Sequence, residues 1–484
     1  MIKQSLFLFI AAATLTHADT IHQNPIIAEA CPLLSHAQCH ISGPFNPLEL
    51  EVNTSQIITP PYVSQSHVQD NPPPPPAPEE EDLKETDYSP WTTPPQCFTN
   101  ANLTSPICVF TDATFASGRG ISIITTAERA YALLNKPAFT HPDLLSSVNI
   151  NQNQNHTHSA PPYELRNIPG RGRGLIATRT LHRGDPIFAS TPILLLDAAA
   201  YDLAPNETSF LTNLAIANLP TASRVQFWKL LGHSASSSSS SSSDPNPIES
   251  RITTNAFQVS INDVEHYALL PTTSMLNHDC RPNADYFFDS ATLLTHHVHA
   301  TRTIYPGEEI TITYISNEKP RHKRRQMLKQ NWGFECKCSA CAAHPALTKE
   351  SDERVMQIGM LKKRLRRWEE RGGDDDENED DEDDGEVRVT PAMADTLISL
   401  YEQERLWTGI GEAYRFAAQV YAAFGREWGA VRYARLAVEF GMLARGFYDE
   451  DVLLMKGLAA DPRSFWGWGR EVARTEEGSE AGRG

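Results

Sequence analysis

Hydrophobic and polar residues alternate over short distances in the middle of the chain. Short runs rich in β-branched residues within 251–261 and 294–314 are bounded by turn signals such as Y-P-G-E-E at 305–309. Short runs of this kind favour small antiparallel sheets over parallel strands joined by long helices. The expected fold class is therefore α+β, with helices outside the small sheets.

Helical spacing of apolar residues appears in four further stretches. It predicts a helix within Phe210–Leu231, a basic helix at Lys319–Asn331, a charged helix at Asp352–Arg371 and two or three amphipathic helices within 391–459. We assign residues 391–475 to a helical region. Its small and aromatic residues resemble tetratricopeptide helices, although one such pair and a cap are too few for a repeat array.

The first 160 residues have a different composition. Residues 19–160 are rich in Pro, Asn, Thr and Ser, with prolines at 72–76 and an Asn/Gln/His tract at 149–158. Such segments bury too little apolar surface to offset backbone ordering, so we expect a mostly disordered region. Within it, Phe110–Thr126 alternates as a hairpin would, and Ala127–Leu134 fits a short helix.

Residues 1–18 have the layout of a cleavable signal peptide. One Lys precedes an apolar run from Leu6 to Leu15, and T-H-A stands before Asp19. The secretory pathway or secretion is the expected localisation, with the nucleus or cytoplasm as the alternative. No later segment approaches eighteen consecutive apolar residues, so no transmembrane segment is predicted.

The net charge of −18 is concentrated in one tract. Eleven carboxylates lie between Asp374 and Glu386, within a segment at 346–390 that combines the charged helix with an acidic loop. The chain has no basic footprint for direct nucleic-acid binding. The acidic loop is typical of a solvated, disordered tract, and less often of a dock for basic protein tails.

Eight cysteines divide into two groups of four. An even count behind a signal peptide favours two disulfides with three possible pairings in the first group: Cys31, Cys39, Cys97 and Cys108. The second group has the spacing of a zinc site and comprises Cys280, Cys336, Cys338 and Cys341. Four thiolates leave no ligand position for water, so this metal would be structural. Disulfides and thiolate–zinc sites suit different redox compartments, and the sequence leaves that conflict open.

The second group lies in two motifs, L-N-H-D-C-R-P-N at 276–283 and G-F-E-C-K-C-S-A-C at 333–341, with T-I-T-Y ending at Tyr314 between them. Together they resemble the C-terminal half of a SET domain with its cysteine-rich post-SET segment, as in protein-lysine methyltransferases. The resemblance implies a SET domain at 161–316, a knot-like active site, an insert at 198–250 containing the serine run, and a zinc-binding post-SET segment at 317–345. The resemblance is to the fungal or SET-and-MYND-like type. The sequence has no cysteine between Cys108 and Cys280, however, so the zinc-binding MYND finger of that family is missing from the insert.

The resemblance also assigns roles to single residues. Tyr314 would be catalytic, and Phe257 and Tyr267 would line the lysine channel, although either could equally be core. Asn255 would be a polar residue near the methyl donor. The residues expected to contact S-adenosylmethionine are Gly172, Arg173, Gly174, Asn277, His278 and Phe334. By themselves, the glycines could form a plain turn, the Asn–His pair a capped turn with a core histidine, and Phe334 a core contact.

Three histidines in T-H-H-V-H-A raise a second metal hypothesis. Strand alternation places His297 and His299 on one face, but neither these nor His296 has an acidic or histidine partner at a convincing spacing. We predict surface histidines on a strand.

The expected function is S-adenosylmethionine-dependent methylation of a protein lysine, in a histone or another protein. The expected partner is a lysine-bearing protein substrate, which could offer a basic tail, and the chain is expected to be a monomer. Two alternatives remain: a SET-fold scaffold without catalytic activity, and a secreted, disulfide-linked binding protein.

Overall fold

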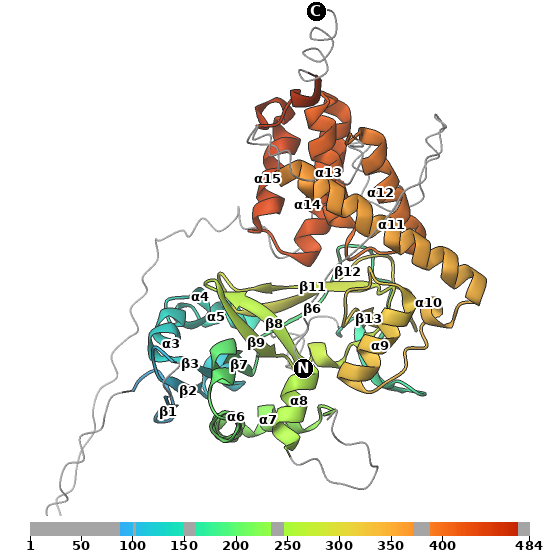
Figure 1. Ribbon diagram of the computed structural model, residues 1–484. Coiled ribbons are helices and arrows are strands. Elements are labelled where there is room, and N and C mark those ends of the chain that lie inside the picture. Colours follow the sequence, from blue (N-terminus) through green and yellow to red (C-terminus); the bar gives the residue numbers. More distant parts are fainter. Residues whose placement is uncertain (1–87, 100–102, 149–159, 234–245, 371–387, 473–484) are drawn as a thin grey trace, which may run out of the picture.

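The computed structural model describes residues 88–99, 103–148, 160–233, 246–370 and 388–472. The predicted signal peptide, Cys31 and Cys39, the serine run and the acidic run all lie outside these residues. Within them, a mixed α+β part made of three small sheets is followed by a helical region (Figure 1).

The largest sheet has six strands in the order β1-β2-β3-β7-β9-β8. All neighbours are antiparallel except β3 and β7. The strands are β1 (Gln96–Phe98), β2 (Ile107–Asp112), β3 (Ile121–Thr126), β7 (Leu194–Asp197), β9 (Val264–Leu269) and β8 (Ala256–Ile261).

The first three of these strands correct the prediction for residues 19–160. The expected hairpin and short helix are present, as β2, β3 and α3 (Ala127–Leu133), but they belong to the folded part. Every residue of β2 and β3 is buried, and apolar side chains such as Phe110 and Ile123 lie in the core. The two strands therefore bury enough surface to order a segment that looks polar on average. The same sheet therefore begins well before residue 161.

Two smaller sheets complete the α+β part. One has the order β10-β13-β5-β4 and consists of β10 (Asn277–His278), β13 (Glu309–Ile312), β5 (Gly172–Ala177) and β4 (Tyr163–Ile168). The other has the order β11-β12-β6 and consists of β11 (Ala284–Asp289), β12 (Thr295–Ala300) and β6 (Pro186–Ser190). The pairing of β10 with β13 is parallel and brings the first cysteine motif beside the strand that leads to Tyr314.

Short helices surround the sheets. The helix predicted at 210–231 is two helices, because Pro220 cannot donate a backbone hydrogen bond and starts a new helix. The elements are α2 (Phe115–Gly118), α4 (Pro137–Thr140), α5 (Asp143–Val148), α6 (Pro205–Asn218), α7 (Thr221–Trp228), α8 (Pro247–Asn255), and the 3₁₀ turns η2 (Ala198–Asp202) and η3 (Thr273–Met275).

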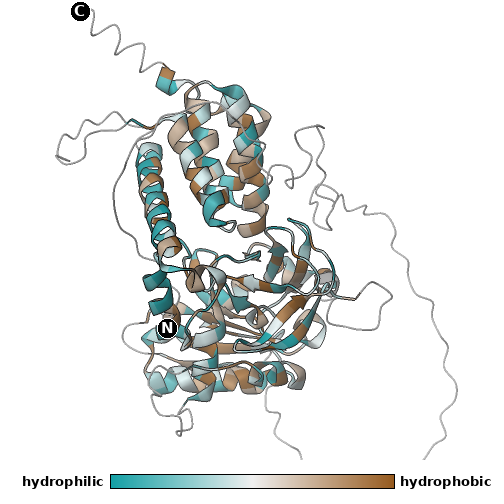
Figure 2. Ribbon diagram, turned by 90° about the vertical axis from the view of Figure 1, so that its right-hand side faces the viewer, coloured by the Kyte–Doolittle hydropathy of each residue, from teal (hydrophilic) through white to brown (hydrophobic). Residues whose placement is uncertain are grey.

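The C-terminal part is helical throughout its described residues, apart from the connections. The basic and charged helices appear as predicted, as α9 (Arg321–Trp332) and α11 (Pro345–Glu370), separated by α10 (Ser339–Ala342). Then follow α12 (Pro391–Glu404), α13 (Ile410–Ala423), α14 (Glu427–Ala444), α15 (Glu450–Ala460) and the turn η4 (Pro462–Ser464). Helices α11 to α15 enclose a hydrophobic core of their own, and Figure 2 shows them as a group above the part that contains the sheets. Their likeness to tetratricopeptide helices stays a prediction.

Ion pairs and close packing join the helical region to the sheets. Arg281, next to a cysteine of the second group, pairs with Glu404 at the end of α12, and Arg183 pairs with Glu439 on α14 at 2.6 Å. Gly446, after α14, lies against the ring of Phe287 on β11. Among the described residues, no helix is long and apolar enough to cross a membrane.

Candidate active site and metal centre

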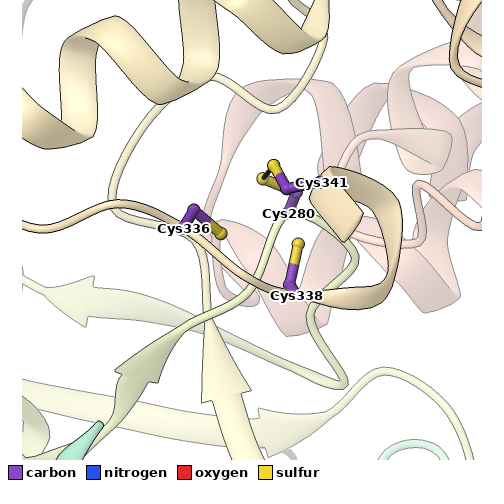
Figure 3. A group of neighbouring side chains, drawn as sticks. All are labelled: Cys280, Cys336, Cys338 and Cys341. Atoms are coloured by element: carbon purple, nitrogen blue, oxygen red, sulfur yellow. Dashed lines mark hydrogen bonds between the residues drawn. The ribbon is translucent and has the colours of Figure 1, made fainter. Parts of the chain in front are cut away.

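The four cysteines of the second group meet at one point, as predicted. Cys280 follows β10, Cys336 and Cys338 precede α10, and Cys341 lies within α10. The four side chains point toward one another (Figure 3). All four are buried, and their sulfur atoms lie within 4.8 Å of one another. A tetrahedral site with metal–sulfur bonds of about 2.3 Å needs sulfurs about 3.8 Å apart, so the arrangement fits zinc.

The electrostatics of the cluster also suit a cation. Hydrogen bonds among the four thiols lower the pKa of Cys338 and Cys341 and raise that of Cys280, so protons leave the cluster unevenly when no metal is bound. The Arg324 guanidinium is buried, which lowers its pKa, but the nearby thiolates of Cys280 and Cys341 raise it by more. Arg324 therefore stays charged and balances part of the negative charge of the thiolates.

Tyr314 lies two residues beyond β13, in contact with the first cysteine motif. Its hydroxyl donates a hydrogen bond to the carbonyl oxygen of Leu276 at 2.6 Å, and its backbone N–H donates to Nδ1 of His278 at 3.0 Å. Burial raises the pKa of Tyr314, so the phenol remains neutral at physiological pH. The rings of Trp332 and Phe334 have their centroids 5.3 and 6.5 Å from that of Tyr314.

At Gly174 the glycine loop is packed against Asn277 without room for a further carbon atom. The amide Nδ2 of Asn277 donates to the carbonyl oxygen of Arg173 at 3.1 Å and to Oε1 of Glu309 at 2.8 Å. A Cβ on Gly174 would lie 2.7 Å from both Asn277 Nδ2 and Glu309 Oε1. Gly172, at the start of β5, has a φ of +73°, a conformation that glycine adopts without strain. The structure therefore brings together the predicted glycine loop and the Asn–His pair.

The residues that follow α7 extend this cluster on one side. Arg173 donates to the carbonyl oxygen of Lys229, and the amide of Asn255 donates to the carbonyl oxygens of Leu231 and Arg251, both at 2.8 Å. Asn255 thus uses its amide to hold the end of α8 to the segment after α7. Its predicted contact with the methyl donor stays a prediction.

Phe257 and Tyr267, the two predicted channel residues, lie on opposite faces of the large sheet. Phe257 pairs with Ala268 across β8 and β9, and Tyr267 pairs with Gln258, so the two rings point in opposite directions. Phe257 joins the hydrophobic cluster on which Tyr314 packs. Tyr267 joins the other cluster, where its ring contacts Tyr201 with centroids 5.8 Å apart. The structure brings only Phe257 near the tyrosine.

Two aromatic neighbours of Phe257 were missed by sequence reasoning. Tyr286 on β11 and His296 on β12 have ring centroids 5.3 and 4.9 Å from that of Phe257, and 4.4 Å from each other. Tyr286 packs on the same cluster as Tyr314. The alternation in A-D-Y-F-F-D places Tyr286 on one face of a strand, but that signal does not say which face meets the site.

The three histidines of β12 do not lie on a surface strand, so that prediction was wrong. His296 and His297 are buried, and His299 is half-buried. His297 and His299 do share a face, because both stack on the ring of Phe287 with centroids 4.8 and 5.7 Å away. Burial lowers the pKa of His297 to about 4 and that of His299 to about 3, so both rings are neutral near pH 7. The neighbouring strand β11 packs against α14 of the helical region, which the local pattern could not reveal.

Comparison with known proteins identifies the domain that carries this site. Residues 172–315 match the sequence model of the SET domain family. This range includes the glycine loop, the Asn–His pair, Cys280 and Tyr314. The chain therefore contains a SET domain.

Several relatives of the chain are named as lysine methyltransferases. The chain is 28% identical to "Histone-lysine N-methyltransferase set5" of Schizosaccharomyces pombe over 201 residues, which is 40% of this chain and 56% of the relative. It is 39% identical to "Protein-lysine N-trimethyltransferase SMYD5" of Homo sapiens over 92 residues, 18% of this chain and 22% of the relative. It is 33% identical to "Histone-lysine N-methyltransferase SMYD3" of Homo sapiens over 94 residues, 19% of this chain and 21% of the relative. The chain thus spans about half of the first relative's length and about a fifth of the others'.

Proposed function

We propose that the protein transfers a methyl group from S-adenosylmethionine to the side-chain nitrogen of a lysine in a protein substrate. The observation that carries this proposal is the meeting of Tyr314 with the Asn277–His278 pair and the glycine loop, inside the segment that matches the SET domain family. The names of the relatives support lysine as the acceptor.

The residues of the cluster fit the methyl donor. The bare backbone at Gly174 keeps the loop close to Asn277, and a side chain there would displace that amide. Asn277, His278 and the ring of Phe334 would hold the donor beside this loop. When bound, S-adenosylmethionine supplies an electrophilic methyl group for in-line displacement by an amine.

The protein's own groups would align and desolvate the lysine. The neutral Tyr314 hydroxyl, fixed by the Leu276 carbonyl, offers a preorganised dipole where charge shifts during transfer. The aromatic rings of Phe257 and Tyr286 exclude water, which favours the uncharged, nucleophilic form of the amine. Alignment and electrostatics together provide the acceleration.

We assign zinc to the four-cysteine site, in a structural role. The ion would tie the segment 333–341 to the loop after β10, and so hold Phe334 and Trp332 beside Tyr314. A segment this short does not fold without such a link, so metal binding would contribute to its folding free energy.

The proposal is tested by replacing the tyrosine. Purified core histones serve as acceptor, because two of the relatives are named for histone lysine, and labelled S-adenosylmethionine as donor. Tyr314→Phe removes one hydroxyl that donates to Leu276, so we expect methyl transfer to fall by about 100-fold or more. Donor binding and thermal stability should change little. Full activity of this variant, or label on acceptors other than lysine, would reject the proposal.

A further inference from the structure

The imidazole of His278 lies between the metal centre and the tyrosine. Its Nδ1 accepts a hydrogen bond from the backbone N–H of Tyr314 at 3.0 Å, and its Nε2 lies 3.4 Å from Sγ of Cys280. The two contacts use the two nitrogen atoms of one ring. A donor-binding role alone needs neither of them.

The first contact determines the direction of the second. A backbone N–H can only donate, so Nδ1 must be the nitrogen without a proton. Nε2 then carries the proton in the neutral ring and points it at the Cys280 sulfur. A metal-bound thiolate is a stronger acceptor than a thiol, since its charge assists the hydrogen bond.

The ring has little freedom to turn. His278 is 4% exposed, and its ring centroid lies 5.4 Å from that of Tyr314 and 6.3 Å from that of Phe334. Its backbone is held as well, because β10 pairs with β13 and the carbonyl oxygen of His278 accepts from Arg171 at 2.8 Å. A change at Cys280 is therefore passed on through a ring of fixed orientation.

We infer that His278 is a positioning residue that couples the four-cysteine site to Tyr314, by donating to the Cys280 thiolate and accepting from the Tyr314 backbone. The inference rests on the zinc site of the proposed function. Loss of the metal would weaken the hold on the imidazole, and through it the hold on the backbone of the tyrosine. Histidine is the residue type that offers a donor and an acceptor on opposite sides of one rigid ring.

Two substitutions separate the two contacts. In His278→Asn the amide oxygen can take the place of Nδ1 and accept from Tyr314, but nothing reaches the thiolate. In His278→Gln the amide nitrogen can take the place of Nε2 and donate to the thiolate, but the acceptor for Tyr314 is lost. A ring that merely fills the core would make both variants fail in the same way.

The experiment measures each contact by itself in the full chain. Zinc affinity is measured by competition with a chromogenic chelator, and protection of the Tyr314 backbone N–H by hydrogen–deuterium exchange of the zinc-loaded protein. His278→Asn should weaken zinc binding by about 10- to 100-fold, the usual effect of losing a group that orients a metal ligand, and should keep the Tyr314 amide protected. His278→Gln should keep the zinc affinity nearly unchanged and should lose the protection.

Two results would overturn the inference: equal losses of both properties in both variants, or no change in either. A wild-type chain that binds no zinc would overturn it as well. Neither measurement requires methyl transfer, so the expected pattern in a chain that fails to bind S-adenosylmethionine would contradict the proposed function and leave the coupling intact.

Discussion

At the scale of single residues, Gly174 is where the backbone alone determines the geometry of the site. A Cβ at this position would lie 2.5 Å from Cδ1 of Ile168 and 2.7 Å from Nδ2 of Asn277. Gly174→Ala should therefore push Asn277 away from the Arg173 carbonyl and Glu309. We expect donor affinity to fall by about tenfold or more, because one polar contact of this kind contributes about 1–2 kcal/mol. Calorimetric titration with S-adenosylmethionine measures the effect.

Gly359 on α11 provides the matched control. A Cβ there meets nothing within 4 Å, and its backbone is helical. Gly359→Ala should leave donor binding unchanged and stabilise the helix by about 0.5–1 kcal/mol. Equal donor affinity of the two alanine variants would contradict the role of Gly174.

The sequence predicts residues within motifs better than residues that meet across the fold. Asn277, His278 and Tyr314 could be assigned together because their motifs resemble a SET domain, and their contacts in the structure are direct. Tyr286 could not, because strand alternation tells which residues share a face but not which face meets Tyr314. For the same reason Tyr267 was predicted to line the channel, whereas it packs on the face of the large sheet opposite to Phe257.

At the scale of elements, the segment 333–341 depends on the four sulfurs for its place. Only α10, four residues long, gives it regular structure, and its buried side chains include the three cysteines. Cys338→Ser should lose the bound zinc and leave the segment open to proteolysis, because three thiolates and a hydroxyl bind zinc weakly. Native mass spectrometry gives the metal content, and limited trypsin digestion gives the rate of cleavage after Lys337, which should rise when the segment opens.

The cysteines outside the cluster provide the control for this experiment. Cys97 and Cys108 form a disulfide between β1 and β2. The double variant Cys97→Ser/Cys108→Ser should lose some stability, because the unfolded chain is no longer cross-linked, but should keep its zinc. Unchanged zinc content in Cys338→Ser, or zinc loss in the double variant, would refute the four-cysteine site.

Elements were predictable where local pattern dominates. The hairpin β2–β3 and helix α9 lie within three residues of their predicted bounds, whereas α11 begins seven residues before its predicted start at Asp352. The membership of β1, β2 and β3 in the six-stranded sheet was not predictable, because it depends on the parallel pairing of β3 with β7, about seventy residues away along the chain. The composition of residues 19–160 is polar on average, and this average does not reveal the two short buried strands β2 and β3.

At the scale of the whole molecule, Glu404 joins the helical region to the metal centre. It lies at the end of α12 and accepts from Arg354 at 2.7 Å, from Ser351 at 2.6 Å, and from Arg281, the residue after Cys280. The Arg281 and Glu404 side chains are only 9% and 4% exposed. Glu404→Ala should therefore cost about 3 kcal/mol in free energy of unfolding, because it leaves a buried arginine without its partner. Urea unfolding measures this cost.

The control for this substitution is Glu353→Ala on α11. Glu353 pairs with Lys349 at 3.9 Å, and both side chains are well exposed, so the pair contributes little. An equal effect of the two alanine variants on the free energy of unfolding would contradict the role of Glu404 at the interface.

The same carboxylate predicts how stability depends on pH. Burial raises the pKa of Glu404, but the Ser351 hydroxyl and the Arg281 and Arg354 guanidinium groups lower it by more, so the pKa lies below its ordinary value of 4.5. A lowered pKa in the folded state stabilises the fold above the unfolded value, and this contribution is lost as the pH falls through the folded value. Unfolding followed from pH 7 to pH 3 should show a smaller acid loss in Glu404→Gln than in the wild type. Identical curves would contradict the assignment.

The arrangement of the helical region against the sheets lies beyond sequence reasoning. The stacking of His297 and His299 on Phe287, and the contact of Phe287 with Gly446, bring together positions about 150 residues apart. Each local stretch is compatible with a solvent-exposed strand, which is why the strand was predicted to lie at the surface. Only the packing of α14 over β11 makes these residues part of an interior.

The most direct test of the account is a calorimetric titration of the purified, zinc-loaded chain with S-adenosylmethionine. We predict saturable binding at one site per chain. It should be weakened in Gly174→Ala and by removal of zinc with a chelator, and preserved in Gly359→Ala. No binding by a folded, zinc-loaded chain would contradict it, because the cluster of Gly174, Asn277, His278 and Phe334 would then have no donor to hold.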